Sequence, residues 1–286
     1  MTSTVGSMPL SVERVRRAAV VTHGRAEAVA DAIPRLQRLA AATGVELAFG
    51  EEEAARHGLP ASARPDEVDI AVVLGGDGTM LRALHRFLGS GIPVIGVNYG
   101  RVGFLASMRP DELEPGLGRA FAGEIEVVEL ATLELELHGR SHIAVNDVVV
   151  TSAVPGRMVE LGWALAGEQL GVQPCDGLIC ATPAGSTAYN LSNGGPVLVW
   201  GLDAMAISFV APHSLTARPL VVPRSRPLEV ENATDDVDTK VIVDGHAVGV
   251  LRPGERTEIR LGAERALIGS VPGTTFFRRY RDAFGE

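Results

Sequence analysis

The clearest folding signal in this chain is the segment Asp69-Ile70-Ala71-Val72-Val73-Leu74-Gly75-Gly76-Asp77-Gly78-Thr79. Its first part is a short apolar run without alternation, which suits a strand buried on both faces of a parallel sheet. A glycine-rich turn follows at once, and residues 80–88 then have the apolar spacing of a helix. The segment therefore predicts a buried strand that turns directly into a helix.

The regions on either side of this segment also alternate between strand and helix. Strands are predicted at 18–24 and 92–97. Helices are predicted at 26–42, where Pro34 marks a local break, and at 111–121. This alternation is typical of an α/β domain with a parallel sheet.

The pattern changes after residue 124. Residues 133–137 alternate Leu and Glu with a period of two, as a half-exposed strand does. Further strands are predicted at 143–150, 159–166, 204–210, 228–231, 240–243 and 257–261. We therefore predict four parts: a flexible tail at 1–12, an α/β domain at 13–124, a β-rich domain at 125–270, and a C-terminal helix at 271–286 that returns to the first domain.

The composition indicates a globular protein with its own core, since 46% of the residues are hydrophobic and 21% are charged. A net charge of −9 disfavours a protein that coats nucleic acid, which favours a basic face. Cys175 and Cys180 match neither a zinc pattern nor a disulfide framework. Residues 1–10 lack the apolar core of a signal peptide, and no apolar run is long enough to span a membrane. We therefore expect a cytoplasmic protein with neither a nucleic-acid nor a membrane partner.

The glycine-rich turn at 75–79 has the chemistry of a phosphate site. Glycines reach positive φ and let a ligand approach the backbone, and the first amides of the next helix favour an anion. Asp77 repels phosphate, so its presence makes sense if it accepts a proton from a hydroxyl or acts through a metal. The alternative is a tight turn in which Asp77 is a local cap. The turn is neither a Walker A loop nor a dinucleotide GxGxxG loop.

Two further segments carry unusual polar residues. Asn146 and Asp147 lie adjacent in the middle of an apolar run, so in a regular strand they point to opposite faces and one of them needs buried partners. A turn or strand-start pair is the alternative. Residues 176–196 are rich in Gly, Ser and Thr, with one aromatic side chain and no histidine. This inventory favours the binding of a polar, planar ligand over nucleophilic catalysis.

Together these segments resemble the NAD kinase family, from about residue 18 to the C-terminus. The 75–79 turn alone resembles a signature that NAD kinases share with diacylglycerol and sphingosine lipid kinases and, in part, with phosphofructokinases. Asn146-Asp147 resembles the family's Asn-Glu/Asp pair, and 176–196 resembles its glycine-rich motif, which lipid kinases lack. Residues 96–106, 212–220 and 243–246 also resemble blocks of the family.

The resemblance implies a fold of the NAD kinase/diacylglycerol kinase type and transfer of the ATP γ-phosphoryl group to the 2′-hydroxyl of the adenosine ribose of NAD. Asp77 is implied as the catalytic base. The implied NAD-binding residues are Asp77, Gly78, Phe104, Asn146, Asp147, Asp176, Thr187, Ala188, Tyr189, Ser192 and His246. The implied phosphate-binding and ATP-binding residues are Gly75, Gly76, Gly78, Thr79 and Arg82. A plain surface arginine is the alternative for Arg82, and a satisfied turn histidine for His246.

The resemblance further implies ATP and NAD as substrates, a divalent metal such as Mg²⁺ that arrives with ATP rather than on protein ligands, and a homodimer or homotetramer. The sequence departs from the common pattern at Asp147, where many members have Glu, and at Ala184, where Thr is commoner. It also lacks the basic residue that often precedes the position of Asp176. The alternative functions are a lipid kinase of the diacylglycerol type and a non-catalytic NAD-binding sensor.

Overall fold

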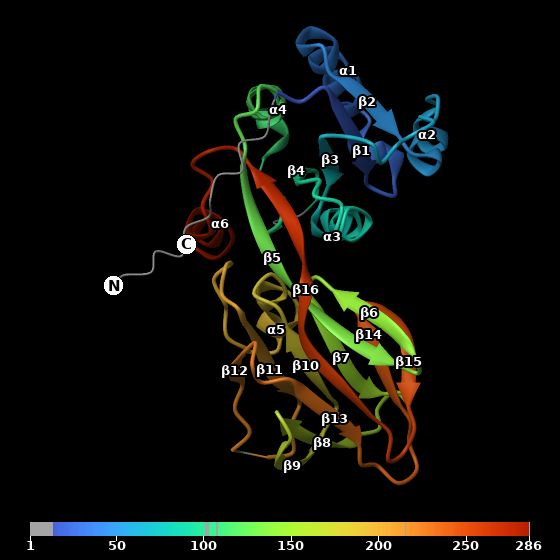
Figure 1. Ribbon diagram of the computed structural model, residues 1–286, viewed down its shortest axis with the longest axis vertical. Helices are drawn as coiled ribbons and strands as arrows, with labels where there is room; N and C mark the ends of the chain where they lie inside the picture. The colour runs from blue at the N-terminus through green and yellow to red at the C-terminus, as the bar shows by residue number, and fades with distance from the viewer. Residues whose placement is uncertain (1–13, 101–102, 107, 215, 286) are drawn as a thin grey trace. The chain divides into compact units, whose positions relative to one another are not determined.

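The computed structural model describes residues 14–100, 103–106, 108–214 and 216–285 (Figure 1). They form two compact units. Unit 1 contains the described residues up to Glu129 together with those from Ala266 onward, and unit 2 is Leu130–Arg265. Each division falls inside a long strand, β5 (Glu126–Leu137) or β16 (Arg256–Ser270), whereas the sequence predicted boundaries at 124 and 270. The tail predicted at 1–12 lies outside the described residues.

Unit 1 is built on a parallel sheet, which confirms the predicted α/β class. Its strands are in the order β2-β1-β3-β4, and each neighbouring pair is parallel. The end of β16 adds a parallel pairing of Ile268 with Val94. The bounds are β1 (Arg17–Thr22), β2 (Glu46–Phe49), β3 (Ile70–Gly75) and β4 (Val94–Asn98).

Helices cover both faces of this sheet because its strands are apolar on both sides. Leu36 of α1 and Leu117 of α4 pack on one face. On the other face Met80 of α3 lies so close to Gly96 that a Cβ there would collide with the Met80 sulfur. The helices of unit 1 are η1 (Ala26–Val29), α1 (Ala32–Thr43), α2 (Glu51–His57), α3 (Asp77–Arg86), η2 (Pro110–Glu112), α4 (Leu113–Phe121) and α6 (Phe276–Phe284).

The expectation that Pro34 breaks the first helix is wrong. The interruption lies between η1 and α1, and Pro34 is the third residue of α1. Proline is tolerated in a first turn because the amides there have no partner within the helix. None of the helices in the described residues is both long and apolar enough to cross a bilayer.

Unit 2 consists of antiparallel strands around an apolar core, as predicted for the second half of the chain. One sheet has the order β12-β11-β10-β7-β14-β15, and the strands β5, β6, β16, β13, β8 and β9 lie outside it. Alternate residues such as Leu133 and Leu135 of β5 and Val148 and Val150 of β7 share one core. The Leu/Glu alternation at 133–137 therefore correctly predicted which side of this strand is buried.

The elements of unit 2 not yet bounded are two short helices and ten strands. They are β6 (Arg140–Ala144), β7 (Asp147–Ser152), β8 (Val159–Leu165), β9 (Glu168–Cys175), β10 (Gly177–Ala181), η3 (Gly185–Thr187), α5 (Tyr189–Ser192), β11 (Ala204–Val210), β12 (Leu220–Pro223), β13 (Leu228–Asn232), β14 (Thr239–Val243) and β15 (His246–Leu251).

The register of the central strands brings distant motifs to one edge of the sheet. Asp147, at the start of β7, pairs with Ala181 at the end of β10. Val148 pairs with Val243 at the end of β14. Strand pairing therefore places the Asn146-Asp147 pair beside the glycine-rich stretch and beside the 243–246 turn.

Candidate active site

The glycine-rich turn links β3 directly to α3. Gly75 is the last residue of β3, and Gly76 precedes the first helical residue, Asp77. A Cβ on Gly75 would lie 2.5 Å from Thr79 Oγ1, and a Cβ on Gly100 would lie 3.1 Å from Gly76 Cα. None of the three glycines of the turn has positive φ. Close approach therefore requires glycine at Gly75, whereas a Cβ on Gly78 would meet nothing within 4 Å, and the expected positive φ is wrong.

The Asp77 carboxylate points away from its own helix and toward the loop 103–106. Its Oδ2 accepts the N–H of Phe104 at 2.7 Å, and its Oδ1 accepts those of Leu105 at 2.9 Å and Ala106 at 3.4 Å. Among the described residues, the hydrogen bonds of its side chain go to this loop and none goes to an amide of α3. Asp77 is thus not the local cap of its own turn, and its carboxylate is held at the start of α3 by a separate loop.

Arg82 lies on α3 within a cluster of arginines around a buried acid. Glu53 of α2 has only 5% of its side chain exposed, and its carboxylate lies 3.4 Å from Arg82 Nη2 and 3.9 Å from nitrogens of both Arg56 and Arg86. Arg82 also donates to the carbonyl of Thr22, at the end of β1, at 2.6 Å. The cluster therefore gathers three arginines near the carboxyl end of β1, where the carboxylates of Glu52, Glu53 and Asp66 pair with them.

Phe104 is packed inside unit 1. Its ring centroid lies 5.2 Å from that of Phe276 and 6.0 Å from that of Phe284, both on α6. Phe104 is 5% exposed. Stacking of this ring on a base would therefore require a change in its packing against α6.

In unit 2, Asn146 and Asp147 are held by the carboxylate of Asp244. Asp244 Oδ2 accepts the N–H of Val145 at 2.7 Å, and its Oδ1 accepts those of Asn146 at 2.8 Å and Asp147 at 2.9 Å. Asp244 has a φ of 47°, in the left-handed region that Asp tolerates better than most residues. The Asp-Gly turn after β14 thus fixes the backbone of the predicted ribose-binding pair.

The two side chains of this pair differ in their surroundings. Burial, followed by the charge of Asp244, raises the pKa of Asp147 to about 7. The buried Oδ1 of Asn146 has no hydrogen-bond donor among the described residues. The pair therefore offers a carboxyl that carries a proton near neutral pH and an acceptor that is ready for a ligand.

The glycine-rich stretch is anchored to the same pair. Thr182 donates its N–H to the Asn146 carbonyl at 2.8 Å and its hydroxyl to the Val145 carbonyl at 2.6 Å. A Cβ on Gly185 would collide with the Asn146 carbonyl. Ser186 is fully buried and its hydroxyl binds backbone groups, so its role is to hold the loop.

The predicted adenine-binding residues follow on η3 and α5. Thr187 and Ala188 are half-buried, while Tyr189 and Ser192 are exposed. Their side chains are accessible to a ligand, unlike the buried loop residues beside them. Asp176, between β9 and β10, and His246, at the start of β15, are also exposed. The His246 ring interacts with the Asp244 carbonyl at 3.1 Å, so it belongs to the turn that holds Asn146.

The predicted site residues thus divide into two sets. The set in unit 1 consists of the 75–79 turn, Arg82 and Phe104, and the remaining residues belong to unit 2. The sequence analysis assigned no role to three residues that hold these sets, Glu53, Thr182 and Asp244. Thr182 and Asp244 had a signal, since they belong to the 176–196 stretch and the 243–246 turn. Glu53 acts through contacts with residues far from it in the chain. Among the described residues, no group of three or more His, Cys, Asp or Glu side chains is arranged to hold a metal ion.

Both halves of the chain match models of one protein family. Residues 21–125 match the model described as the ATP-NAD kinase N-terminal domain, and residues 145–269 match the ATP-NAD kinase C-terminal domain. The NAD kinase of Aromatoleum aromaticum is 32% identical over 96% of this chain and 95% of its own length. The NAD kinase of Thermomicrobium roseum is 35% identical over 93% and 89%.

Solved structures agree with the fold. An NAD kinase from Archaeoglobus fulgidus in complex with ATP superposes with a TM-score of 0.72, at 27% identity over 94% of this chain and 97% of that one. A yeast NADH kinase complexed with NADH superposes with a TM-score of 0.80 over 95% and 88%; at 21% identity it supports the fold alone.

Proposed function

Because this chain belongs to the ATP-NAD kinase family and has its phosphotransferase activity, we propose that Asp77 is the base that activates the 2′-hydroxyl of the adenosine ribose of NAD. The observation that carries the proposal is the fixed Asp77 carboxylate at the start of α3. A carboxylate can accept about four hydrogen bonds, and here three backbone amides donate to it. Oδ2 receives one amide, which leaves it a second lone pair for a hydroxyl proton.

The proposed reaction transfers one phosphoryl group. The 2′-oxygen forms a bond to the γ-phosphorus, the bond from that phosphorus to the β,γ-bridging oxygen breaks, and the hydroxyl proton passes to Asp77. ADP leaves with the bridging oxygen. Because an alcohol is a poor nucleophile at neutral pH, the base and its alignment both contribute to the rate.

The same turn supports a phosphate-binding role. We propose that the backbone of Gly75, Gly76, Gly78 and Thr79 binds ATP phosphates, with Arg82 adding charge. We further propose that a divalent metal such as Mg²⁺ arrives on the phosphates of ATP. When bound there, it would neutralise phosphate charge during transfer.

For NAD, the proposed contacts lie in unit 2. Asn146 Oδ1 accepts a ribose hydroxyl, for which it has no competing donor among the described residues. Asp147, with a pKa raised to about 7 by burial, donates or accepts at a second oxygen. The accessible residues of η3 and α5 surround the adenine. The full proposed set is Asp77, Gly78, Phe104, Asn146, Asp147, Asp176, Thr187, Ala188, Tyr189, Ser192 and His246.

Two further properties are proposed with this function. The family resemblance favours a homodimer or homotetramer. A cytoplasmic location is supported by Cys175 and Cys180, which are both buried and free. Size-exclusion chromatography with light scattering tests the first, and cell fractionation tests the second.

The test of the base is Asp77→Asn in an assay that couples NADP formation from ATP, Mg²⁺ and NAD. Turnover should fall by roughly 10²–10⁴-fold. The matched control is Asp69→Asn, because the Asp69 carboxylate also accepts two backbone amides, at 2.7 and 2.9 Å, away from the turn. Near-normal turnover of Asp77→Asn would remove Asp77 from the role. Parallel assays with NADH and with polyphosphate define the substrates.

A further inference from the structure

Four loop residues of unit 1, Gly103–Ala106, lie between Asp77 and an arginine of α6. On one side, the amides of the last three of these residues donate to the Asp77 carboxylate. A Cβ on Gly103 would lie 2.5 Å from Asp77 Oδ1, so the backbone packs directly against that carboxylate. The loop therefore determines where the Asp77 oxygens lie.

On the other side, Arg279 holds the carbonyls of the same residues. Its Nη1 donates to the Phe104 carbonyl at 3.1 Å and to the Leu105 carbonyl at 2.8 Å. Phe104 and Leu105 thus each use their N–H for Asp77 and their C=O for Arg279. In these two consecutive residues both the N–H and the C=O group are hydrogen-bonded, which leaves the backbone little freedom to rotate.

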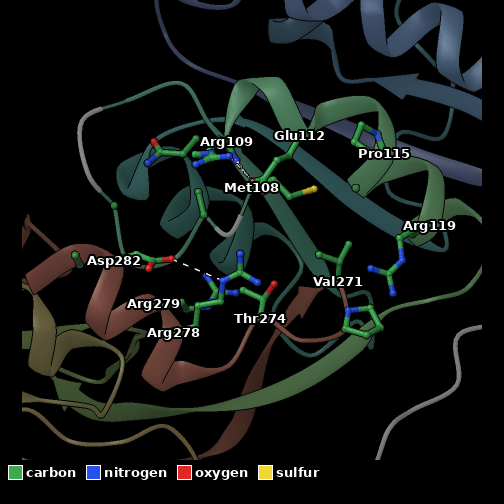
Figure 2. Close-up of a pocket in the computed structure, with 16 residues that line it drawn as sticks. Met108, Arg109, Glu112, Pro115, Arg119, Val271, Thr274, Arg278, Arg279 and Asp282 are labelled. Atoms are coloured by element: carbon green, nitrogen blue, oxygen red, sulfur yellow. Dashed lines mark hydrogen bonds and ion pairs between the residues drawn. The ribbon is translucent and has the colours of Figure 1, made fainter. Parts of the chain in front are cut away.

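Arg279 differs from the other arginines of its helix. It is 6% exposed, whereas the neighbouring Arg278 has 53% of its side chain exposed and lies 3.9 Å from Asp282. Both arginines line a cavity of about 530 Å³ in unit 1, together with parts of α4 and the loop. Figure 2 shows the two side chains among the residues that line it. The buried guanidinium costs desolvation energy, and the carbonyls it binds offset that cost.

Arg279 remains charged despite this burial. Burial lowers its pKa to about 10, while the negative charge of Asp77 acts in the opposite direction. At neutral pH a full positive charge therefore sits behind the loop whose front face binds Asp77. Phe276 and Phe284 pack on Phe104 from the same helix and add an apolar contact to this arrangement.

We propose that Arg279 is a positioning residue for the reaction: by holding the carbonyls of Phe104 and Leu105, it fixes the amides that aim the Asp77 carboxylate. This inference rests on the proposed role of Asp77 as the base. The competing role for Arg279 is purely structural, as an anchor of α6. An anchor lowers stability when it is removed, but it leaves the turnover of the folded protein unchanged.

The first experiment compares Arg279→Gln with the control Arg278→Gln on the same helix. All variants are assayed at least 15 °C below their own melting temperatures, so that folded protein is compared with folded protein. Arg279→Gln should lower kcat by roughly 10–100-fold, because small misplacements of a catalytic group have effects of that size, and the KM values for ATP and NAD should change by less than about threefold. Arg278→Gln should match the parent. An unchanged kcat in folded Arg279→Gln overturns the proposal.

The second experiment repeats Arg279→Gln in the Asp77→Asn background. If Arg279 acts through the carboxylate, the double variant should turn over within about twofold of Asp77→Asn alone, since the two effects are not additive. If Arg279→Gln lowers kcat by the same factor in both backgrounds, the inference is wrong. Near-normal turnover of Asp77→Asn alone instead removes the proposed base, which is a separate result.

A third variant covers the case in which Arg279→Gln does not fold. Arg279→Lys keeps the charge but has no planar guanidinium to hold two carbonyls. Its kcat should fall by roughly 3–30-fold, with KM values close to those of the parent. A folded Arg279→Lys protein with parental kcat then overturns the proposal.

Discussion

Asp147 and Asp244 are joined by two hydrogen bonds that run in opposite directions. The Asp244 carboxylate accepts the Asp147 N–H at 2.9 Å, and the Asp244 N–H donates to the Asp147 carbonyl at 3.0 Å. Each residue therefore fixes the other, and the charge of Asp244 is brought close to the buried side chain of Asp147. That proximity adds to the effect of burial in raising the pKa of Asp147 to about 7.

The raised pKa predicts how stability depends on pH. Because the pKa of Asp147 in the folded protein exceeds the ordinary value of 3.8, the native state holds a proton that the unfolded state releases. The stabilisation of the folded state by protonated Asp147 is fully present below pH 3.8. It is lost as pH rises through about 7, and the free energy of unfolding falls by up to roughly 1.4 kcal/mol per pH unit. Asp147→Asn should remove this decline. Urea denaturation of the parent and of Asp147→Asn between pH 5 and pH 8 measures the free energy of unfolding. If the two proteins show the same dependence on pH, the prediction is contradicted.

Removal of the Asp244 carboxylate should destabilise unit 2. Asp244→Ala leaves the amides of Val145, Asn146 and Asp147 without their acceptor, at about 1–3 kcal/mol for each buried amide that stays unsatisfied. Asp244→Asn is the matched control, since it keeps one acceptor oxygen and tolerates the positive φ. The free energy of unfolding should decrease in the order parent, Asn, Ala. An Ala variant as stable as the Asn variant would show that the amides find other partners.

Neutralising Glu53 should weaken ATP binding. Glu53→Gln leaves Arg56, Arg82 and Arg86 close together without their shared carboxylate, so Arg82 keeps the Thr22 carbonyl but loses its buried ionic partner. We expect the KM for ATP to rise by up to about tenfold, equivalent to about 1.4 kcal/mol. The free energy of unfolding should fall by about 1–3 kcal/mol, since the arginines are partly exposed and keep Glu52 and Asp66 as partners. Glu51→Gln, on the exposed side of the same helix, is the control. An unchanged KM for ATP in the folded variant would separate Arg82 from phosphate binding.

Tyr189 should contribute to NAD binding without contributing to stability. It is 46% exposed, and stacking of an aromatic ring on a base is worth about 1–3 kcal/mol. Tyr189→Ala should therefore raise the KM for NAD by roughly 5–100-fold, with a melting temperature close to that of the parent. Tyr189→Phe keeps the ring and should retain most of the affinity. Equal KM values for the Ala and Phe variants would argue against stacking.

Local signals predicted much of the fold. The uninterrupted apolar run 70–74 identified a central strand, and the Leu/Glu alternation at 133–137 identified a half-buried one. The sequence predicted 257–261 as a short strand, but β16 continues to Ser270, and its end pairs with β4 at Ile268. Helix α2 was not predicted at all, since Glu-Glu-Glu-Ala-Ala-Arg-His has no apolar periodicity.

The candidate site was predictable where its residues form motifs and unpredictable where long-range contacts hold them. Asp77 and Asn146 stand out because an acid beside glycines, or an amide in an apolar run, lacks an ordinary structural reason. Glu53 and Arg279 look like surface charges in polar helices. Their burial depends on packing against segments 29 and 174 residues away, which no local pattern encodes.

The division of the chain has a consequence for folding during synthesis. Unit 2 is one continuous segment, whereas unit 1 is completed only when the end of β16 and α6 have been added after it. On the ribosome, unit 2 can thus reach its native state while β4 still lacks the pairing of Val94 with Ile268. The strands β1 to β4 precede unit 2 in the chain, so their sheet gains its last pairing only after unit 2 has been synthesised.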